Sequence, residues 1–596
     1  MQLQNTLTQS ISQALQALFQ ISVDGTQIAL QPTRKEFAGS FTFVTFPFTK
    51  QVGKGPEQIG QALGEYLKEH APEVKDFNVV KGFLNLEVKE AEWLRLFRHI
   101  MQQPDYGQAE ASGRNVMVEY SSPNTNKPLH LGHLRNNFLG YSVAEIMKAN
   151  GHNVMKANLV NDRGIHICKS MLAYEKMGNG ETPESSGLKG DHLVGKYYVL
   201  FDKAYKEQVE ELVAQGTDKE EAKKKAPLML EAQDMLRKWE EGDTQVVSLW
   251  KQMNSWVYAG FDETYRTIGV DFDKYYYESG TYMLGKELVE EGLQKEVFFR
   301  KENGSVWVDL TDEGLDEKLL LRADGTSVYI TQDLGTAQLK YNDFPYDQSV
   351  YVVADEQNYH FQVLKGVLKK LGKPYAEGIY HLSYGMVDLP SGKMKSREGT
   401  VVDADELVQE MIDTARQQTE ELGKIEGFTP EQAQALYHTL AMGALKYFLL
   451  KVDPKKRMLF NPQESIDFRG NTGPFVQYTH ARISAILRKA TEMGLTVDVN
   501  AFGSFENLHE TEQEVIAQLA AYPAVIEEAG KLYAPSIIAN YAYELAKAYN
   551  RFYQEVSIFN ETDEQARHFR IALSAMVARF IRHSMRLLGI EVPERM

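Results

Sequence analysis

The chain has 596 residues, a formal net charge of −17 at pH 7, 43% hydrophobic residues and 25% charged residues. These values are typical of globular proteins in water, and no apolar run approaches the roughly 20 residues that are needed to span a bilayer. Cys168 is the only cysteine, which excludes an internal disulfide and a cysteine-based zinc site and favours the reducing cytoplasm.

Residues 1–110 are predicted to form a small α+β domain. Apolar residues recur at helical spacing from Leu7 to Leu18, and strands are expected at 40–46 and 77–88. The polar, turn-rich segment 102–114 is predicted to link this domain to the next.

Strands and helices alternate over residues 111–402, which predicts a Rossmann-type α/β domain with ligands at the carboxyl ends of its parallel strands. The expected elements are strand 116–120, helix 131–149, strand 153–160, helix 332–341, strand 348–354, helix 357–371 and strand 379–387. A charge-rich helical insertion at about 178–275 interrupts the alternation. Asn-Gly at 303–304 and Asp-Gly at 324–325 predict hairpin turns. Residues 403–596 are expected to form an all-α bundle.

The net negative charge argues against a nucleic-acid partner. Basic residues nevertheless cluster in the C-terminal third, in a loop at 451–457, on a helix at 482–489 and in the last helices at 567–586. Only local fields act at moderate salt, because screening extends over about 10 Å. These clusters therefore leave RNA binding and a solvated surface about equally favoured.

The segment EYSSPNTNKPLHLGHLR, residues 119–135, follows the first strand of the predicted sheet. His130 and His133 are three residues apart, so both imidazoles project from one face of a first helical turn. The free backbone N–H groups of such a turn bind anions, and Gly132 leaves room for a flat ring beside the backbone. Together these features predict a site for a nucleoside triphosphate.

The loop KMKSREG, residues 393–399, is a second candidate phosphate element. It follows a strand that ends in Gly385-Met386-Val387. The cations Lys393, Lys395 and Arg397 suit a polyphosphate whose negative charge grows in the transition state. Such a loop can close over ATP and complete the site.

Tyr329 and Asp333 are four residues apart at a predicted helix start, so their side chains can meet on one face. A guanidinium pairs with a carboxylate through two parallel hydrogen bonds and stacks on an aromatic ring, which fits this pair. A carboxylate at a helix N-terminus is also favoured by the helix dipole. From local sequence alone the two explanations of Asp333 are equal.

These motifs, in this order, resemble the arginyl-tRNA synthetases, a family of class I aminoacyl-tRNA synthetases. HLGH is similar to the HIGH signature, with Leu131 in place of isoleucine, and the string SPNTNKP before it is similar to the arginyl family in particular. KMKSREG resembles the KMSKS loop but has Ser396 at the second lysine. Arginyl enzymes often lack a standard loop here, and a lysine just before HIGH is thought to compensate, a position held by Lys127.

The resemblance implies functional residues at matching positions. Those that act on the phosphates are Lys127, His130, His133, Lys393 and Arg397. ATP is expected to contact His130, Gly132, His133, His360, Gly385, Met386, Val387 and Lys393. The residues expected to contact arginine are Glu119, Asn124, Tyr329, Asp333 and Gln357.

The same resemblance implies contacts with tRNA at both ends of the chain. The strand GFLNL at 82–86 and the segment NTGPFVQYTHAR at 471–482 resemble family motifs, and the chain ends as the family does. The expected tRNA contacts are Phe83, Asn85, Gln477, Tyr478, Arg482 and Met596. The implied partners are tRNA(Arg), L-arginine and ATP with Mg²⁺, with no protein-held metal and no membrane. The implied protein is a cytoplasmic monomer.

Two alternatives stay open. The first is another class I synthetase, for glutamate, glutamine or cysteine. Acidic substrates would require cations where Asp333 stands, and the cysteinyl enzymes bind zinc through cysteines that this chain lacks. The second is a synthetase-derived RNA-binding protein without catalysis, which the presence of His130, His133, Lys127 and Lys393 disfavours.

Overall fold

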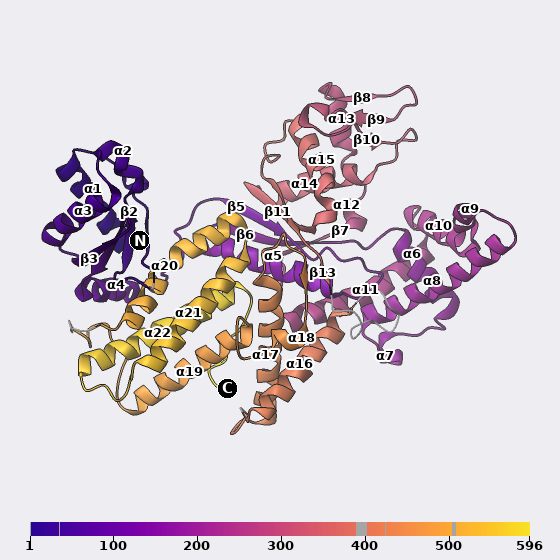
Figure 1. Ribbon diagram of the computed structural model, residues 1–596. Coiled ribbons are helices and arrows are strands. Elements are labelled where there is room, and N and C mark those ends of the chain that lie inside the picture. Colours follow the sequence, from indigo (N-terminus) through magenta and orange to yellow (C-terminus); the bar gives the residue numbers. More distant parts are fainter. Residues whose placement is uncertain (1, 35, 389–401, 424, 504–507) are drawn as a thin grey trace.

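The computed structural model describes residues 2–34, 36–388, 402–423, 425–503 and 508–596. Its N-terminal part, indigo in Figure 1, is an antiparallel sheet in the order β1-β2-β4-β3 with helices packed beside it. The strands are β1 (Leu30–Pro32), β2 (Phe41–Val44), β3 (Val74–Val80) and β4 (Phe83–Val88). The helices are α1 (Gln2–Phe19), α2 (Thr49–Val52), α3 (Pro56–His70) and α4 (Glu90–Gln102).

The single strand expected at 77–88 is wrong, because the chain turns back between β3 and β4. Lys81 and Gly82 both have positive φ, at 49° and 80°. A glycine adopts this left-handed conformation readily, and the turn lets the two strands pair antiparallel. Alternation of side chains does not by itself reveal such a tight turn.

The centre of the molecule is a five-stranded sheet in the order β12-β11-β5-β6-β7, with every neighbouring pair parallel. Its strands are β5 (Asn115–Glu119), β6 (Asn153–Val160), β7 (Lys274–Tyr277), β11 (Gln348–Ala354) and β12 (Ile379–Tyr384). The helices between them are α5 (Leu131–Ala149), α6 (Ile165–Met177), α14 (Tyr329–Asp343) and α15 (Asn358–Lys370). The predicted Rossmann-type parallel sheet is confirmed.

The predicted helical insertion projects from the body at the right of Figure 1. It contains α7 (Pro183–Ser186), α8 (Gly190–Ala214), α9 (Lys219–Lys225), α10 (Pro227–Glu240) and α11 (Thr244–Ile268). The chain then enters β7 at the sheet edge, followed by α12 (Glu278–Thr281) and α13 (Lys286–Gln294). A small antiparallel sheet follows, with β8 (Phe298–Arg300), β9 (Val306–Val308) and β10 (Lys318–Leu321). Asn303-Gly304 joins β8 to β9 as predicted.

The C-terminal part is a helical bundle, as expected. It consists of α16 (Ala404–Glu421), α17 (Pro430–Leu450), α18 (Pro462–Ser465), α19 (Gly473–Glu492), α20 (Glu510–Leu532), α21 (Pro535–Glu555) and α22 (Glu564–Leu587). The expectation that it is purely helical is wrong at one place, where β14 (Met458–Leu459) pairs in parallel with β13 (Val387–Asp388), which follows β12.

Long-range contacts bind the three parts together. Arg98 of α4 donates to the carbonyls of Phe502 and Gly503, at 3.2 and 2.7 Å. Ser142 of α5 donates to the carbonyl of Leu587 at 2.8 Å, which attaches the bundle to the helix that opens with HLGH. The domain boundaries at residues 110 and 402 stay predictions.

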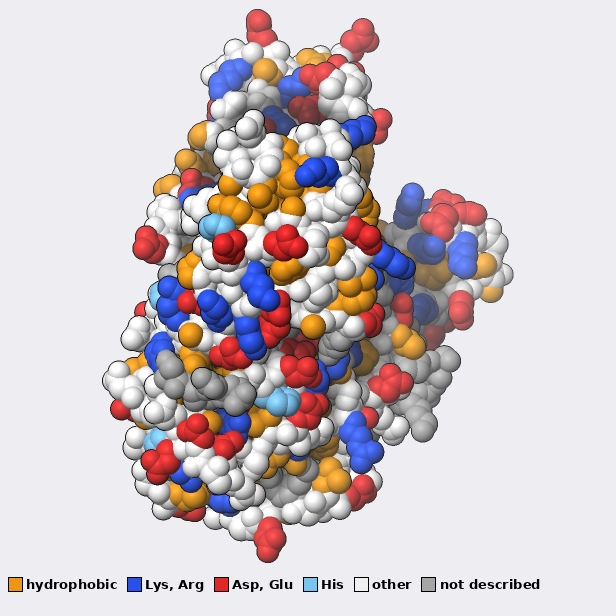
Figure 2. All heavy atoms as spheres, turned by 60° about the vertical axis from the view of Figure 1, so that its left-hand side comes forward, with side chains coloured by type: hydrophobic (Ala, Val, Ile, Leu, Met, Phe, Trp, Pro, Cys, Tyr) orange, Lys and Arg blue, Asp and Glu red, His pale blue; other side chains and the backbone are white. Residues whose placement is uncertain are grey.

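None of the described helices combines the length and apolar character that a membrane span requires. On the face shown in Figure 2, basic and acidic side chains lie interspersed rather than separated into large areas of one sign.

Candidate active site

The chain leaves strand β5 through two strained residues. Ser121 and Ser122 have φ of 74° and 45°, a left-handed conformation that costs a non-glycine residue free energy. Side-chain oxygens of Asn136 and Asn158 accept their backbone N–H groups at 2.6 and 3.1 Å and hold the bend. The bend brings Asn124 to the carboxyl edge of the sheet, where its side chain is exposed.

The HLGH turn begins helix α5 with a reciprocal cap. His130 is the N-cap, and its Nδ1 accepts the N–H of Gly132 at 3.1 Å. Nδ1 of His133 in turn accepts the N–H of His130 at 3.2 Å. The two rings are 3.9 Å apart between centroids. The predicted pair on one face of the first turn is therefore confirmed.

The electrostatic surroundings keep both histidines neutral. Burial, and then the charge of Lys127, lower the pKa of His130 to about 4. Burial, together with His130 and Lys127, lowers the pKa of His133 well below its usual value. Burial also lowers the pKa of the half-buried Lys127 ammonium. A cation held in a poorly hydrated position is suited to an anionic ligand.

The loop that carries Lys393 and Arg397, residues 389–401, lies outside the described residues. Its C-terminal flank is placed beside the HLGH turn. The N–H of Leu131 donates to the carbonyl of Val402 at 3.0 Å, and the N–H of Ala404 donates to the carbonyl of Leu129 at 3.0 Å. Residues 402–404, which follow the predicted phosphate loop in the chain, therefore adjoin the HLGH turn.

A cavity of about 540 Å³ opens at the carboxyl edge of the sheet. Three predicted arginine contacts line it, namely Asn124, Tyr329 and Asp333. Tyr329 is 78% exposed at the start of α14. Nε2 of His360 lies 2.6 Å from Asp333 Oδ2, so α15 contributes a partner to the carboxylate.

Glu278 is a further carboxyl group in this cavity that the sequence analysis missed. Burial raises its pKa to about 7, an effect that Arg163 opposes and that Asp162 and Asp333 add to. Glu278 follows the end of β7, where ligand-binding residues of a parallel sheet are expected. The sequence analysis could not place Glu278 at a strand end, because β7 comes directly after the long insertion and was itself not predicted.

The structure does not bring the other two predicted arginine contacts to the cavity lining. The Glu119 carboxylate is buried and forms an ion pair with Lys340, which is 1% exposed. The carboxylate therefore already has a positive partner within the protein. Gln357 lies exposed in a short turn before α15.

Two predicted tRNA contacts, Phe83 and Asn85, line a smaller cavity of about 180 Å³ on the N-terminal sheet. Asn85 is buried. Its Oδ1 accepts from Thr42 Oγ1 at 2.6 Å and its Nδ2 donates to Asn78 Oδ1 at 2.8 Å. The amide is therefore held in one orientation at the floor of the cavity.

Gln477, an expected tRNA contact, is fully buried, so it has no exposed side chain to offer to tRNA in this structure. Its Nε2 donates to the carbonyls of Thr439 and Glu591, at 2.9 and 2.8 Å. Nδ1 of His480 contacts the carbonyl of Pro593 at 2.9 Å. The motif thus fastens the C-terminal segment instead of facing solvent.

The other three predicted tRNA contacts are partly exposed. The guanidinium of Arg482 lies over the rings of Tyr478 and Tyr553, at 4.9 and 5.5 Å, and donates to Asn550 Oδ1. Met596 packs at the margin of the bundle core.

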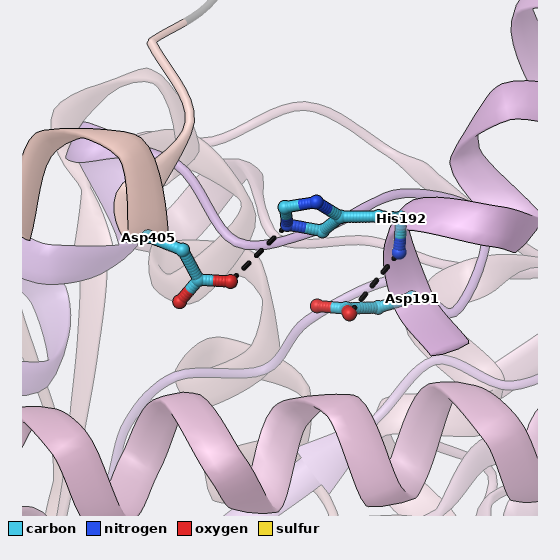
Figure 3. Close-up of side chains that lie close together, drawn as sticks. All are labelled: Asp191, His192 and Asp405. Atoms are coloured by element: carbon cyan, nitrogen blue, oxygen red, sulfur yellow. Dashed lines mark hydrogen bonds and ion pairs between the residues drawn. The ribbon is translucent and has the colours of Figure 1, made fainter. Parts of the chain in front are cut away.

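Asp191 and His192 of α8 and Asp405 of α16 form a cluster (Figure 3). Their spacing would allow a metal ion, but the ammonium of Lys189 is already paired with Asp405 and lies 3.3 Å from Asp191 Oδ2. Burial would lower the pKa of His192, but the hydrogen bond with Asp405 and nearby carboxylates outweigh it and raise the pKa. The cluster attaches the start of α16 to the insertion and has its own cation.

Comparison with known proteins gives matches along the whole chain. The models described as "Arginyl tRNA synthetase N terminal domain", "tRNA synthetases class I (R), catalytic domain" and "DALR anticodon binding domain" match residues 5–88, 96–461 and 476–596. Proteins named arginine–tRNA ligase from Amoebophilus asiaticus and Bacteroides thetaiotaomicron are each 58% identical to it, over 99% and 100% of both chains.

Two solved structures share the fold. Arginyl-tRNA synthetase from Thermus thermophilus has a TM-score of 0.77 at 24% identity, covering 100% of both chains. The enzyme from Plasmodium falciparum has a TM-score of 0.75 at 18% identity, covering 100% of this chain and 99% of that one. From the family models and the full-length relatives we conclude that the chain belongs to the arginyl-tRNA synthetases, with a class I catalytic domain.

Proposed function

We propose that this protein joins L-arginine to tRNA(Arg) at the expense of ATP, which enters with Mg²⁺. The specificity for arginine is inferred from the cavity lined by Asn124, Asp333 and Glu278, which contains two carboxyl groups. A guanidinium offers five N–H donors in a rigid plane and has no acceptor. Two carboxylates and the exposed Tyr329 ring supply acceptors and a stacking surface for it.

In the first step the arginine carboxylate attacks the α-phosphorus of ATP in line. The bond from that phosphorus to the bridging oxygen of pyrophosphate breaks, and arginyl-adenylate forms. His130 and His133 donate from Nε2 to phosphate oxygens, and Lys127 with Lys393 stabilises the growing negative charge. Arg397 assists from the same loop as Lys393. Catalysis of this kind depends on positioning and electrostatics, with no covalent enzyme intermediate.

In the second step a hydroxyl of the terminal adenosine of tRNA attacks the arginyl carbonyl, and AMP leaves. Asn124 holds the substrate end near the sheet edge. Gly132 and the segment 385–387 receive the adenine. Phe83 and Asn85 receive an unpaired base of the tRNA, since stacking and base-edge hydrogen bonds are the usual means of reading one.

ATP–pyrophosphate exchange with each standard amino acid, with and without tRNA, tests this function. We expect exchange with arginine alone, and only when tRNA is present. Exchange with a different amino acid would reassign the cavity while keeping class I chemistry. The absence of exchange under all conditions would favour an RNA-binding protein without catalysis. A monomer located in the cytoplasm belongs to the same proposal.

A further inference from the structure

Arg135, two residues after His133 on helix α5, has unusual surroundings. It is fully buried, and the carboxylates of Asp453 and Asp355 act on its charge only from a distance, without a direct ion pair among the described residues. Its guanidinium instead donates to four backbone carbonyls. The acceptors are Gly385 at 2.6 Å, Met386 at 3.4 Å, Pro454 at 3.2 Å and Lys456 at 2.9 Å.

The four carbonyls belong to two segments that meet above the guanidinium. The N–H of Gly385 donates to the carbonyl of Pro454 at 2.9 Å, and the N–H of Met458 donates to that of Met386 at 3.1 Å. A Cβ at residue 385 would lie 2.6 Å from the backbone nitrogen of Arg457, so only glycine allows this approach. The contact between these two segments continues as the β13–β14 strand pair, and β13 lies next to α5 in Figure 1.

One of these segments leads directly to the ATP site. Residues 385–387 follow β12 and precede the loop 389–401 that carries Lys393. The other, residues 454–457, is the basic loop of the C-terminal bundle. The guanidinium is thus the common attachment point of α5, the root of the phosphate loop and a loop of the bundle.

The charge of Arg135 is retained at this position despite its burial. Burial lowers its pKa to about 10, which leaves it protonated at neutral pH. A buried cation is unfavourable unless its donors are satisfied. Nη1 and Nη2 have carbonyl acceptors here, whereas Nε has none among the described residues. An apolar side chain would fill the space without this cost, but it could not fix the direction of four carbonyls as a planar fork does.

We propose that Arg135 is a positioning residue for the ATP-dependent step. Helix α5 presents His130 and His133 at its start, and Arg135 two residues later fixes the segment 385–388 relative to them. The spacing between the histidines and the segment 385–388 is thereby set by one helix. A displacement of about 1 Å in such a site can reduce the rate by about a hundredfold. The proposal rests on the proposed function, because it assigns ATP to these two elements.

The test compares Arg135→Met and Arg135→Lys with a matched control, Arg570→Met. Arg570 is also buried, but it pairs with Glu512 and Glu561 within the bundle. Steady-state exchange is measured with arginine and tRNA present, and thermal melting is recorded for each variant.

Arg135→Met is expected to raise the KM for ATP at least tenfold and to lower kcat by about ten- to a hundredfold, while the KM for arginine stays within twofold. Arg135→Lys keeps the charge and some of the hydrogen bonds. Its KM for ATP and its kcat are therefore expected to lie between those of wild type and Arg135→Met. Arg570→Met is expected to lower the melting temperature without changing the KM for ATP. Equal changes in both KM values, or an ATP KM within twofold of wild type in Arg135→Met and Arg135→Lys, would overturn the proposal.

A binding measurement separates this proposal from the proposed function. ATP with Mg²⁺ is titrated into wild type and into Arg135→Lys by calorimetry, without arginine or tRNA. Weaker binding in the variant supports the positioning role even if wild type activates a different amino acid. Equal binding, together with unchanged exchange kinetics, counts against it.

Discussion

Nδ1 of His133 accepts the backbone N–H of His130 at 3.2 Å, so the second histidine of the HLGH turn caps the helix that the first one opens. Because Nδ1 of His130 also accepts a backbone N–H, neither Nδ1 carries the proton of a neutral ring. Both protons therefore lie on Nε2. The turn thus presents two neutral hydrogen-bond donors with defined directions.

The neutrality of these rings predicts that they do not titrate near neutral pH. His130 has a pKa of about 4, below its usual value, so it becomes protonated only far below pH 6. We expect wild type and His130→Asn to show the same shape of kcat/KM for ATP between pH 6 and 8, with the variant about a hundredfold slower. The ionisation of ATP affects both proteins equally, so its contribution to the pH profile cancels in this comparison. A loss of activity below pH 7 in wild type alone would contradict the assignment.

Glu278 predicts a pH dependence of arginine binding. Its pKa is raised to about 7, so the ionised fraction, and with it the attraction for a guanidinium, falls as the pH falls from 8 to 6. The KM for arginine should therefore rise over this range in wild type. Glu278→Gln should raise that KM by about tenfold at pH 8 and flatten the dependence, while the KM for ATP stays the same. A variant with the wild-type pH profile would exclude Glu278 from the arginine site.

Lys127 is expected to stabilise negative charge on the ATP phosphates, because it supplies a cation where the phosphate loop has Ser396. Lys127→Ala should slow arginine activation by about ten- to a hundredfold, as removal of one stabilising group does. Lys176, an exposed lysine paired with Glu231, provides the control substitution. An unchanged activation rate in Lys127→Ala would refute this role.

The buried pair of Lys340 and Glu119 predicts a large asymmetry between single and double substitutions. Lys340→Met leaves the carboxylate buried and unpaired, which should lower the free energy of unfolding by about 3–5 kcal/mol. Lys340→Met with Glu119→Leu should recover most of this loss. Denaturant unfolding of Lys340→Met, Glu119→Leu and the double variant measures the coupling. Additive losses would show that the two side chains do not interact.

Burial of Gln477 predicts an effect on stability rather than on tRNA affinity. Gln477→Leu removes two donors to backbone carbonyls and should lower the free energy of unfolding by about 1–3 kcal/mol, with the KM for tRNA within twofold. Arg482→Ala, on the same helix but partly exposed, should raise the KM for tRNA several-fold. The reverse pattern would restore Gln477 as an RNA contact.

Local patterns predicted the elements on which the site is built. Helix 131–149 and the strands 153–160 and 348–354 have the predicted bounds, because long periodic segments with clear end signals are easily recognised. The pair of histidines followed from spacing, whereas the assignment of Tyr329 and Asp333 to arginine rested on the resemblance to the family. The sequence analysis missed features that depend on distant segments, since no local period records them. Arg135 contacts residues about 250 and 320 positions away in the sequence. Glu278 reaches the cavity only because the chain returns from the insertion to the edge of the sheet.

The bond between Ser142 and Leu587 has a consequence for synthesis of the protein. Helix α5 leaves the ribosome early, but its partner follows 445 residues later. At about 5–20 residues per second this is a delay on the order of 20–90 s. During that time the apolar face of α5 lacks the helices that cover it in the finished protein. The helix that begins with the HLGH turn is therefore a segment where a molecular chaperone can shield apolar surface during synthesis.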